Sequence, residues 1–340
     1  MPQRYFIVGI TAVAALWLYI DRVCFSTLAT PMKRELLLPI APEPGPGDDL
    51  SEEEIDEAKK EKHQAHPEVA EESIQLTAEE IVAAKKKKWA DKRMSYALGA
   101  FFLTYAIFQI PMGSLADRYG TRRVLALSIA AWSIVTMATG FVLGFVALLG
   151  LRLILGITES GAYPAAAGLI KKWVPPGERG RCSSIVAFGG RCGGAIAPWL
   201  TAALATGLIG VAVVEWAISP TPVSVGSDGK PPPNWRGVFV VYGFCGLLVA
   251  QLFWMFVRDH PPAHAALEDA KPHHDAAGLT FLQRVGLLAR TRNMWMSGGL
   301  QFGVNIGWAF IVTLLPTYLK EAYRIPLKEV GPMQSTALTI

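Results

Sequence analysis

The sequence predicts an all-α membrane protein: a six-helix bundle, a seventh helix and the start of an eighth, where the chain appears truncated. Two observations carry this prediction. The chain of 340 residues is 51% hydrophobic, with 32 glycines and 10 tryptophans, which is too apolar for a soluble protein of this size. Its apolar residues also gather into segments of about 20 residues, the length that an α-helix needs to cross a bilayer.

Seven such segments follow one another along the chain. They cover approximately residues 5–30, 95–115, 124–145, 148–170, 183–209, 237–257 and 294–315. Thirteen Lys or Arg residues lie in the connections on the side of the N-terminus, and five lie in the short connections on the other side. Because cytoplasmic loops carry the excess of basic residues, we expect a multi-pass protein of a bacterial inner (plasma) membrane with a cytoplasmic N-terminus.

The composition between the segments divides the chain into four parts. These are an N-terminal six-helix transmembrane bundle (1–34 and 93–258), an external charged helical insertion (35–92), a cytoplasmic linker (259–292) and the start of a C-terminal bundle (293–340). In the insertion, Ser51 with Glu54 and Thr77 with Glu80 form two capping boxes, each of which predicts the start of a helix. The second of these helices is expected to continue through Trp89 into the second span.

One apolar segment carries two opposite charges on a single face. Arg152, Gly156, Glu159 and Tyr163 are spaced so that they form one stripe of a helix whose remainder is almost wholly apolar. A charge near the bilayer centre costs about 2.5–3.5 kcal/mol even on the lenient insertion scale, so such residues normally face a protein interior or a water-filled cavity. These residues are therefore functional candidates.

The intramembrane charges do not balance. Asp21, Arg22, Arg152, Glu159 and Arg191 sum to +1, so one base lacks a protein partner. An organic monoanion would supply that partner, and the planar fork of arginine suits a carboxylate. We therefore expect Arg22 or Arg191 to bind substrate, although a purely structural pairing with the two acids is the alternative.

Further along the chain, Asn305 lies in the seventh segment, where it either lines a cavity from a second half or only packs. We expect no metal, cofactor or nucleic acid. The four cysteines show no metal spacing, and prolines interrupt the helical spacing of His260, His264 and Glu268. Enzymatic activity is not expected, because no nucleophile with a base, metal cluster or nucleotide loop appears.

The segment "GSLADRYGTRR" connects the second and third spans. Its glycines suit a tight turn and close helix packing, its aspartate suits a helix N-terminus, and its arginines hold the loop inside. The residues of this expected gating loop are Gly113, Asp117, Arg118, Gly120, Arg122 and Arg123. Their spacing resembles the signature loop of the major facilitator superfamily, whose members have two six-helix halves and transport by rocking one half against the other.

The chain resembles more closely the anion:cation symporter family within that superfamily, which includes sugar-acid transporters and the sialin and vesicular glutamate transporter group. The resemblance rests on "YIDRVCFSTLATP", "YAIFQIPMGSLADRYG", "RLILGITESGAYPA", "KKWVPPGERGR" and "LPTYL". It covers nearly the whole chain apart from residues 35–92. It implies that a C-terminal half of the transporter is missing from this chain.

The resemblance also implies roles for single residues. Asp21 and Glu159 would carry protons, Arg22 would contact the substrate's carboxylate, and Arg152 would hold Glu159 ionised in one state. Tyr105 and Gln109 would line the cavity as hydrogen-bond groups. Arg191 departs from the pattern, since many relatives place a small or amide residue there.

These observations favour proton-coupled symport of a small organic anion, a sugar acid or similar carboxylate, by alternating access. One alternative is an anion uniporter or antiporter without proton coupling. Another is a transporter-derived receptor or scaffold in which residues 35–92 bind a partner and nothing is transported. The expected partners are the anion, protons and the lipid bilayer.

Overall fold

The computed structural model describes residues 3–44, 51, 55–56, 58–59, 62–63, 75–205, 234–260 and 281–309. The described part is helical. Its elements are α1 (Gln3–Leu36), η1 (Leu38–Ile40), α3 (Ala78–Tyr119), α4 (Thr121–Thr139), α5 (Phe145–Glu159), α6 (Ala162–Trp173), η3 (Pro176–Glu178), α7 (Arg179–Ala205), α9 (Trp235–Phe256), α10 (Phe281–Arg290) and α11 (Arg292–Ala309). The eighth apolar segment predicted at the end of the chain lies outside the described residues.

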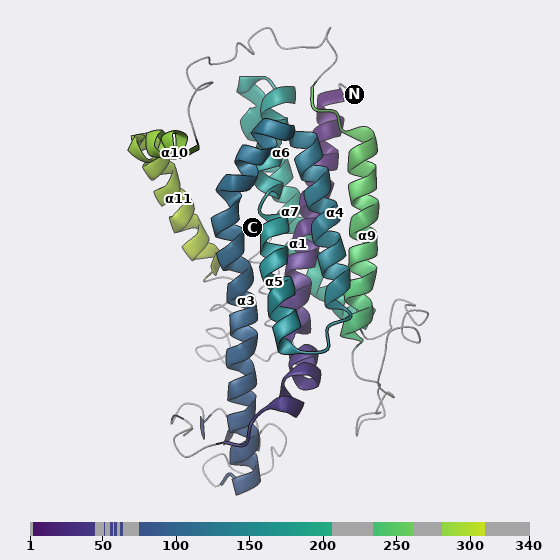
Figure 1. Ribbon diagram of the computed structural model, residues 1–340, viewed down its shortest axis with the longest axis vertical. Coiled ribbons are helices and arrows are strands. Elements are labelled where there is room, and N and C mark those ends of the chain that lie inside the picture. Colours follow the sequence, from purple (N-terminus) through teal and green to yellow (C-terminus); the bar gives the residue numbers. More distant parts are fainter. Residues whose placement is uncertain are drawn as a thin grey trace.

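The helices from α1 to α9 form one bundle with α1 near its centre (Figure 1). Helix α1 packs against α7 and α9, α4 packs against α9 and α5, and α3 packs against α5. Glycines permit the closest of these contacts, since a Cβ at Gly189 would lie 2.6 Å from the carbonyl oxygen of Ala12 and one at Gly193 would meet that of Leu16. The close approach of α1 and α7 therefore depends on glycine at these positions.

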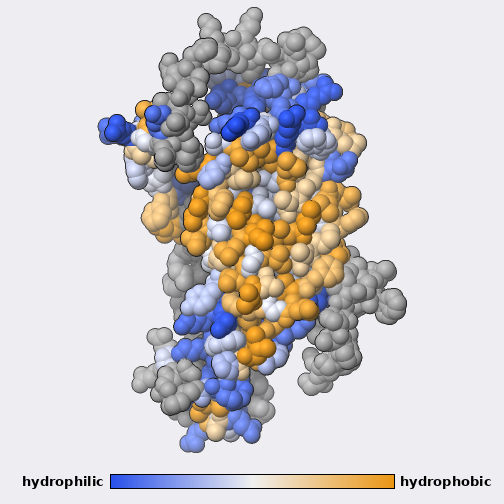
Figure 2. Space-filling view, viewed as in Figure 1, coloured by the Kyte–Doolittle hydropathy of each residue, from blue (hydrophilic) through white to orange (hydrophobic). Residues whose placement is uncertain are grey.

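On the face shown in Figure 2, apolar side chains form a belt across the middle of the molecule, with hydrophilic side chains toward both ends. By length and composition, four stretches in the described residues are long and apolar enough to cross a membrane: 3–40, 78–119, 145–173 and 235–256. Helices α4 and α7 lie alongside them in the same bundle. The chain is thus a multi-pass membrane protein.

The two ends of the bundle separate the charged segments as expected. The N-terminus lies at the same end as the α3–α4 turn and the end of α6, while α3 begins at the opposite end (Figure 1). The part of the predicted insertion that forms the start of α3 therefore lies at the end of the bundle opposite Arg122 and Lys171. Which end faces the cytoplasm remains a prediction.

Helix α3 is one continuous helix of 42 residues that begins far outside the apolar belt. The capping box at its start is present: Glu80 N donates to Thr77 Oγ1 at 3.3 Å, and Thr77 N donates to the Glu80 carboxylate at 2.7 Å. Continuation through Trp89 into the span is thus confirmed. The first predicted capping box falls partly outside the described residues, because Glu54 is among those not described.

Glu80 provides a test of this helix start. Lys62 Nζ donates to Glu80 at 2.8 Å, and this bond, with the one from the Thr77 backbone, lowers the pKa of Glu80 below its ordinary value. A lowered pKa stabilises the folded form above the ordinary carboxyl pKa, and the stabilisation is lost as the pH falls through the folded-state pKa. We therefore expect the protection factors of the amides in the first turn of α3, which are corrected for the intrinsic pH dependence of exchange, to fall on acidification in the parent and much less in Glu80→Gln.

The predicted fourth span is interrupted, which corrects the expectation of one uninterrupted helix. Helix α5 ends at Glu159 and α6 begins at Ala162. Pro164 has no N–H to donate to the carbonyl of Ser160, and its ring crowds that carbonyl, so the helical ladder breaks there. The break places Glu159 at the last position of a helix inside the bundle.

Arg236 joins three elements at the end of the bundle where α9 begins. Its side chain donates to Glu35 at 2.8 Å and 3.0 Å, to Gly140 O at 3.0 Å and to Val142 O at 2.8 Å. Trp235 Nε1 donates to the same Glu35 carboxylate at 2.6 Å. The end of α1, the α4–α5 turn and the start of α9 are thereby joined.

Helices α10 and α11 stand beside the bundle (Figure 1). The described side chains of α11 are exposed, among them Trp295 at 66%. Helix α10 lies within the segment predicted as a linker, and its helical structure was not predicted.

Candidate functional site

A buried ion pair joins α1 to the end of α5. Arg22 Nη2 and Nε donate to the same Glu159 oxygen, Oε2, at 2.8 Å and 3.2 Å. The Glu159 side chain is 0% exposed and that of Arg22 is 18% exposed. The second oxygen, Glu159 Oε1, is buried and has no hydrogen-bond partner among the described residues. The pair is therefore desolvated but incompletely bonded.

Three aromatic rings surround the Arg22 guanidinium. Its central carbon lies 4.6 Å from the ring centroid of Tyr105, 5.2 Å from that of Phe101 and 5.4 Å from that of Tyr19. The negative faces of such rings stabilise a cation that has been removed from water. Contacts with these three rings, which form an aromatic cage, therefore help to stabilise the guanidinium in its desolvated position.

Gly156 allows the cage to form. A Cβ at this position would collide with Thr104 Oγ1 and with the Phe101 carbonyl on α3. In its place Thr104 Oγ1 donates to Leu153 O at 3.0 Å and joins α3 to α5. The contact brings the cage residues of α3 against the ion pair.

The charged stripe of α5 faces the bundle interior, as predicted. Arg152 is 3% exposed and Glu159 is 0% exposed. Arg152 does not hold Glu159 in this structure; its guanidinium carbon lies 3.2 Å from the ring centroid of Phe25. The predicted Arg152–Glu159 pairing, which was assigned to one state of the protein, therefore stays a prediction for another state.

Asp21 is separated from its sequence neighbour Arg22. It is 2% exposed, and both of its carboxylate oxygens lack hydrogen-bond partners among the described residues. The indole of Trp132 lies near this carboxylate, but its N–H forms no hydrogen bond with a described residue. Because successive residues of an α-helix point about 100° apart, Asp21 faces α4 while Arg22 faces α3 and α5.

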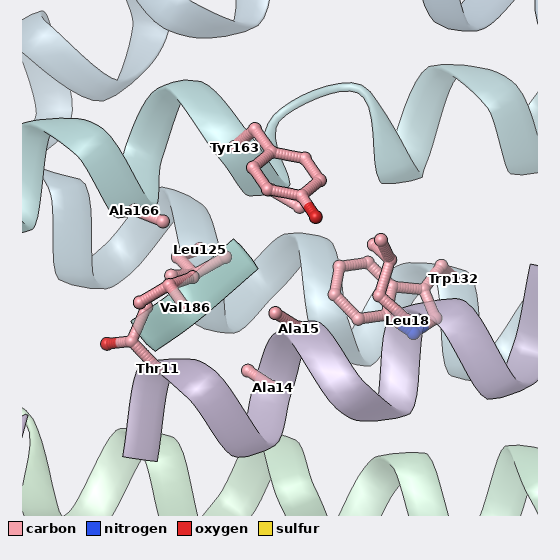
Figure 3. Close-up of a pocket in the computed structure, with 10 residues that line it drawn as sticks. Thr11, Ala14, Ala15, Leu18, Leu125, Trp132, Tyr163, Ala166 and Val186 are labelled. Atoms are coloured by element: carbon pink, nitrogen blue, oxygen red, sulfur yellow. The ribbon is translucent and has the colours of Figure 1, made fainter. Parts of the chain in front are cut away.

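A small cavity of about 10 Å³ lies between α1, α4, α6 and α7. Leu18, Trp132 and Tyr163 are among its lining residues, and Figure 3 shows the Tyr163 hydroxyl pointing inward. The space suits about one water molecule. It is much too small for a sugar acid, so the cavity itself is not the substrate site.

The other predicted substrate residues are dispersed. Tyr105 contacts Arg22 in the cage, and Gln109 is half-buried one turn further along α3. Arg191 is exposed on α7, has no ion-pair partner among the described residues, and makes no described contact with the Arg22–Glu159 pair. Asn305 lies in α11, but its side chain is outside the described residues.

The gating loop has the predicted turn. Gly120 has φ 97°, which favours glycine, and a Cβ there would lie 2.9 Å from an Asp259 oxygen. At Gly113 a Cβ would lie 3.4 Å from Pro164 Cβ, an ordinary van der Waals contact, so this structure does not require glycine there. Asp117, Arg118 and Arg123 are exposed.

Asp259, at the end of the sixth span, occupies the helix N-terminus that the sequence suggested for Asp117. Its Oδ1 accepts hydrogen bonds from Arg122 N at 2.8 Å and Thr121 Oγ1 at 3.1 Å, and lies 3.8 Å from Lys172 Nζ. Arg122 Nη2 also donates to Trp254 O at 2.6 Å. Sequence reasoning missed Asp259; the lack of a capping side chain at Gly120 was the one available signal.

Comparison with known proteins identifies the family. Residues 23–340 match the model of the Major Facilitator Superfamily. The chain belongs to this superfamily. Its members are membrane transporters and not enzymes, and the all-α fold inferred from the sequence is confirmed.

The similar curated proteins fall in the predicted anion:cation symporter and sugar-acid group. A probable sulfoacetate transporter of Cupriavidus necator is 30% identical over 70% of this chain and 51% of its own length. Sialin of Ovis aries is 27% identical over 78% and 50%, and a probable galactarate/D-glucarate transporter of Escherichia coli is 27% identical over 74% and 56%. The chain spans about half the length of the curated relatives it matches.

Solved superfamily structures share the fold. An inward-facing bacterial homologue of the human lysosomal transporter Spinster gives a TM-score of 0.61 at 21% identity, covering 100% of this chain and 60% of that one. The human organic anion transporter MFSD10 gives 0.60 at 15% identity, covering 99% and 70%. At these identities the likeness concerns the fold alone.

Proposed function

We propose that the transporter containing this chain couples the movement of a small organic anion to that of protons, in symport by alternating access, with its N-terminus in the cytoplasm of a bacterial cell. The observation that supports this proposal is the buried Arg22–Glu159 pair inside the aromatic cage. It provides one cation that can bind a carboxylate and one acid whose protonation would release that cation. The two functions meet in a single pair of side chains.

The chemistry follows from the charges of the pair. When Glu159 is ionised, Arg22 is neutralised and has little affinity for an anion. When Glu159 takes up a proton, the caged guanidinium lacks a counter-ion in a low-dielectric site and attracts the substrate carboxylate in its place. Proton uptake and anion binding therefore favour one another, and by linkage each strengthens the other equally.

The substrate class follows from the same site and from the relatives. Those named for sulfoacetate and for galactarate or D-glucarate support a carboxylate-bearing substrate. Tyr105 and Gln109 would donate hydrogen bonds to its hydroxyl groups, and Asn305 would contribute from the second half. Arg152 would form an ion pair with Glu159 in one state of the transport cycle and hold it ionised there.

Arg191 is proposed as a second contact to the anion. Ser184 and Pro198 lie seven residues before and after Arg191 and therefore share its face of α7. The exposed apolar side chains Ile185 and Trp199 lie on the adjacent face, about 100° away around the helix. An arginine beside a lipid-facing stripe, but not within it, suits the face where the second half of the transporter would pack.

Arg191→Lys tests whether this contact is bidentate. An ammonium is a point charge and cannot form two parallel bonds to a carboxylate, so we expect substrate affinity to fall about tenfold in the full-length protein. Isothermal titration or competition binding measures the change. Arg181→Lys, also on α7 and near its first turn, serves as the control and should bind normally. Unchanged affinity in Arg191→Lys would remove Arg191 from the site.

Uptake into proteoliposomes, with and without an inward proton gradient, tests the function as a whole. Accumulation of a labelled hexonate above its external concentration only with the gradient supports symport. Equilibration that the gradient does not affect would mean a uniporter, and uptake that requires an internal anion would mean an antiporter. A full-length protein that binds a partner through residues 35–92 but transports no organic anion would be a receptor or scaffold.

A further inference from the structure

Several buried polar atoms on neighbouring turns of α1 and α4 have no hydrogen-bond partner among the described residues. Within the described part of the chain these are both Asp21 oxygens, Trp17 Nε1, Trp132 Nε1 and Thr136 Oγ1. Trp17 and Asp21 are one turn apart on α1, and Trp132 and Thr136 are one turn apart on α4. A partnerless buried polar atom costs about 1–3 kcal/mol, so their accumulation in one place needs a physical explanation.

These atoms belong to one neighbourhood. Leu18 of α1 and Trp132 of α4 line the same cavity, which places Trp132 next to the part of α1 that carries Trp17 and Asp21. Trp17 Nε1 and Ser133 Oγ of α4 both lie next to Gly246 of α9: a Cβ at Gly246 would be 2.8 Å from the first atom and closer still to the second. The Trp17 ring also packs edge-on against Tyr242 of α9, with 5.7 Å between ring centroids. Helices α1, α4 and α9 thus enclose the group.

The donors and acceptors are complementary but do not pair directly. The two indole N–H groups only donate, the carboxylate oxygens accept when ionised, and the Thr136 hydroxyl does both. Water bonds to all of these groups and typically makes about three hydrogen bonds in a buried site. Space for water exists at one edge, since Trp132 also lines the cavity of about 10 Å³ in Figure 3.

The titratable groups near Asp21 form no hydrogen bond with its carboxylate, so water is the partner left for its oxygens. Arg152 and Glu159 of α5 lie near the Asp21 carboxylate and have opposite electrostatic effects on it. The other titratable neighbours are Cys24 on the same helix and Tyr242 and Cys245 on α9. None of them bonds to its oxygens. Arg22, the nearest basic residue in sequence, donates to Glu159 on another side of α1.

We propose that Asp21, Trp17, Trp132 and Thr136 surround a hydrated pocket inside the bundle, and that Asp21 exchanges its proton with this buried water instead of through the Arg22–Glu159 site. The two carboxyl groups then have separate proton environments: Glu159 responds to the anion on Arg22, and Asp21 responds to the pocket. This role of Asp21 in coupling rests on the proposed function, but the hydration of the pocket does not.

Hydroxyl-radical footprinting of the full-length protein tests the hydration directly. Radicals formed from bound water oxidise side chains next to that water, even when bulk solvent cannot reach them. Trp132 and Met32 are both 0% exposed and of readily oxidised types, but Met32 lies in an apolar cluster. We expect Trp132 to be oxidised at least about threefold faster than Met32. Equal rates, or no oxidation of Trp132, would overturn the proposal even if transport is proton-coupled.

Two matched threonines of α4 test the proton route. Thr136 and Thr139 are both 2% exposed, but the Thr139 hydroxyl donates to Val135 O at 2.9 Å whereas that of Thr136 has no described partner. Thr136→Val should slow proton-driven uptake about fivefold, the effect of one lost hydrogen bond, without changing substrate counterflow. Thr139→Val should change neither. Equal behaviour of the two variants would contradict the route.

A requirement for sodium provides the remaining test. If uptake at fixed pH needs sodium, and Asp21→Asn removes that need, the pocket holds a cation and the proposal is wrong. The proposal is supported if uptake needs no sodium, Asp21→Asn loses proton-driven accumulation, and Glu159→Gln loses accumulation but keeps substrate exchange.

Discussion

Glu159→Gln is expected to abolish proton-driven accumulation of substrate while leaving substrate exchange intact. The glutamine keeps the size of the side chain but cannot ionise, so it imitates the protonated acid at every pH. Arg22 then stays free of an anionic partner and available to the substrate carboxylate in both the outward-facing and the inward-facing state. We expect accumulation to fall at least tenfold and substrate affinity to rise, because competition from the Glu159 carboxylate is removed.

Proteoliposomes containing the full-length protein provide both measurements, since accumulation requires a proton gradient and counterflow does not. Glu178→Gln is the matched control: Glu178 pairs with Arg4 at 3.5 Å, but its side chain is 35% exposed at the end of the bundle. This control should accumulate substrate normally. If Glu159→Gln concentrates substrate as well as the parent protein does, Glu159 has a structural role and the coupling assignment fails.

The spans could be predicted from the length of the apolar segments, and the buried stripe from periodicity. Arg152 and Glu159 are buried because a helix that is otherwise apolar must turn its charges away from lipid. The break after Glu159 could also have been predicted, since Pro164 stands inside the apolar segment. The φ of 97° at Gly120 agrees with the turn that its position suggested.

Contacts between distant residues were not accessible in this way. Asp21 and Arg22 are neighbours in sequence, yet their side chains are directed at different helices. Asp259 bonds to Arg122 N across 137 positions of the chain. Arg236, which the sequence presents as one more external base, is 6% exposed and bound to Glu35 and two carbonyls. Each of these contacts depends on how the helices rotate against one another, and periodicity does not determine that rotation.

Arg22→Met is expected to have the largest effect on stability. Methionine fills much of the aromatic cage but leaves the Glu159 carboxylate, which is 0% exposed, without its cation. Removing one partner of a buried pair costs about 3–5 kcal/mol, because the remaining charge is neither solvated nor paired. Substrate binding should be lost as well, since the guanidinium is the proposed carboxylate ligand.

The double variant Arg22→Met/Glu159→Gln separates these two effects. With the carboxylate gone, no uncompensated charge remains in the bundle, so we expect its unfolding temperature in detergent to recover most of what Arg22→Met loses, while substrate binding stays absent. Arg181→Met is the control for the loss of an arginine, because Arg181 is exposed near the first turn of α7 and has no described ion-pair partner; its stability should match that of the parent. A double variant as unstable as Arg22→Met would show that Arg22 stabilises the bundle through its contacts with the rings of Tyr19, Phe101 and Tyr105 and not through its charge. Exchange of the arginine between Glu159 and a substrate anion would then no longer explain the coupling.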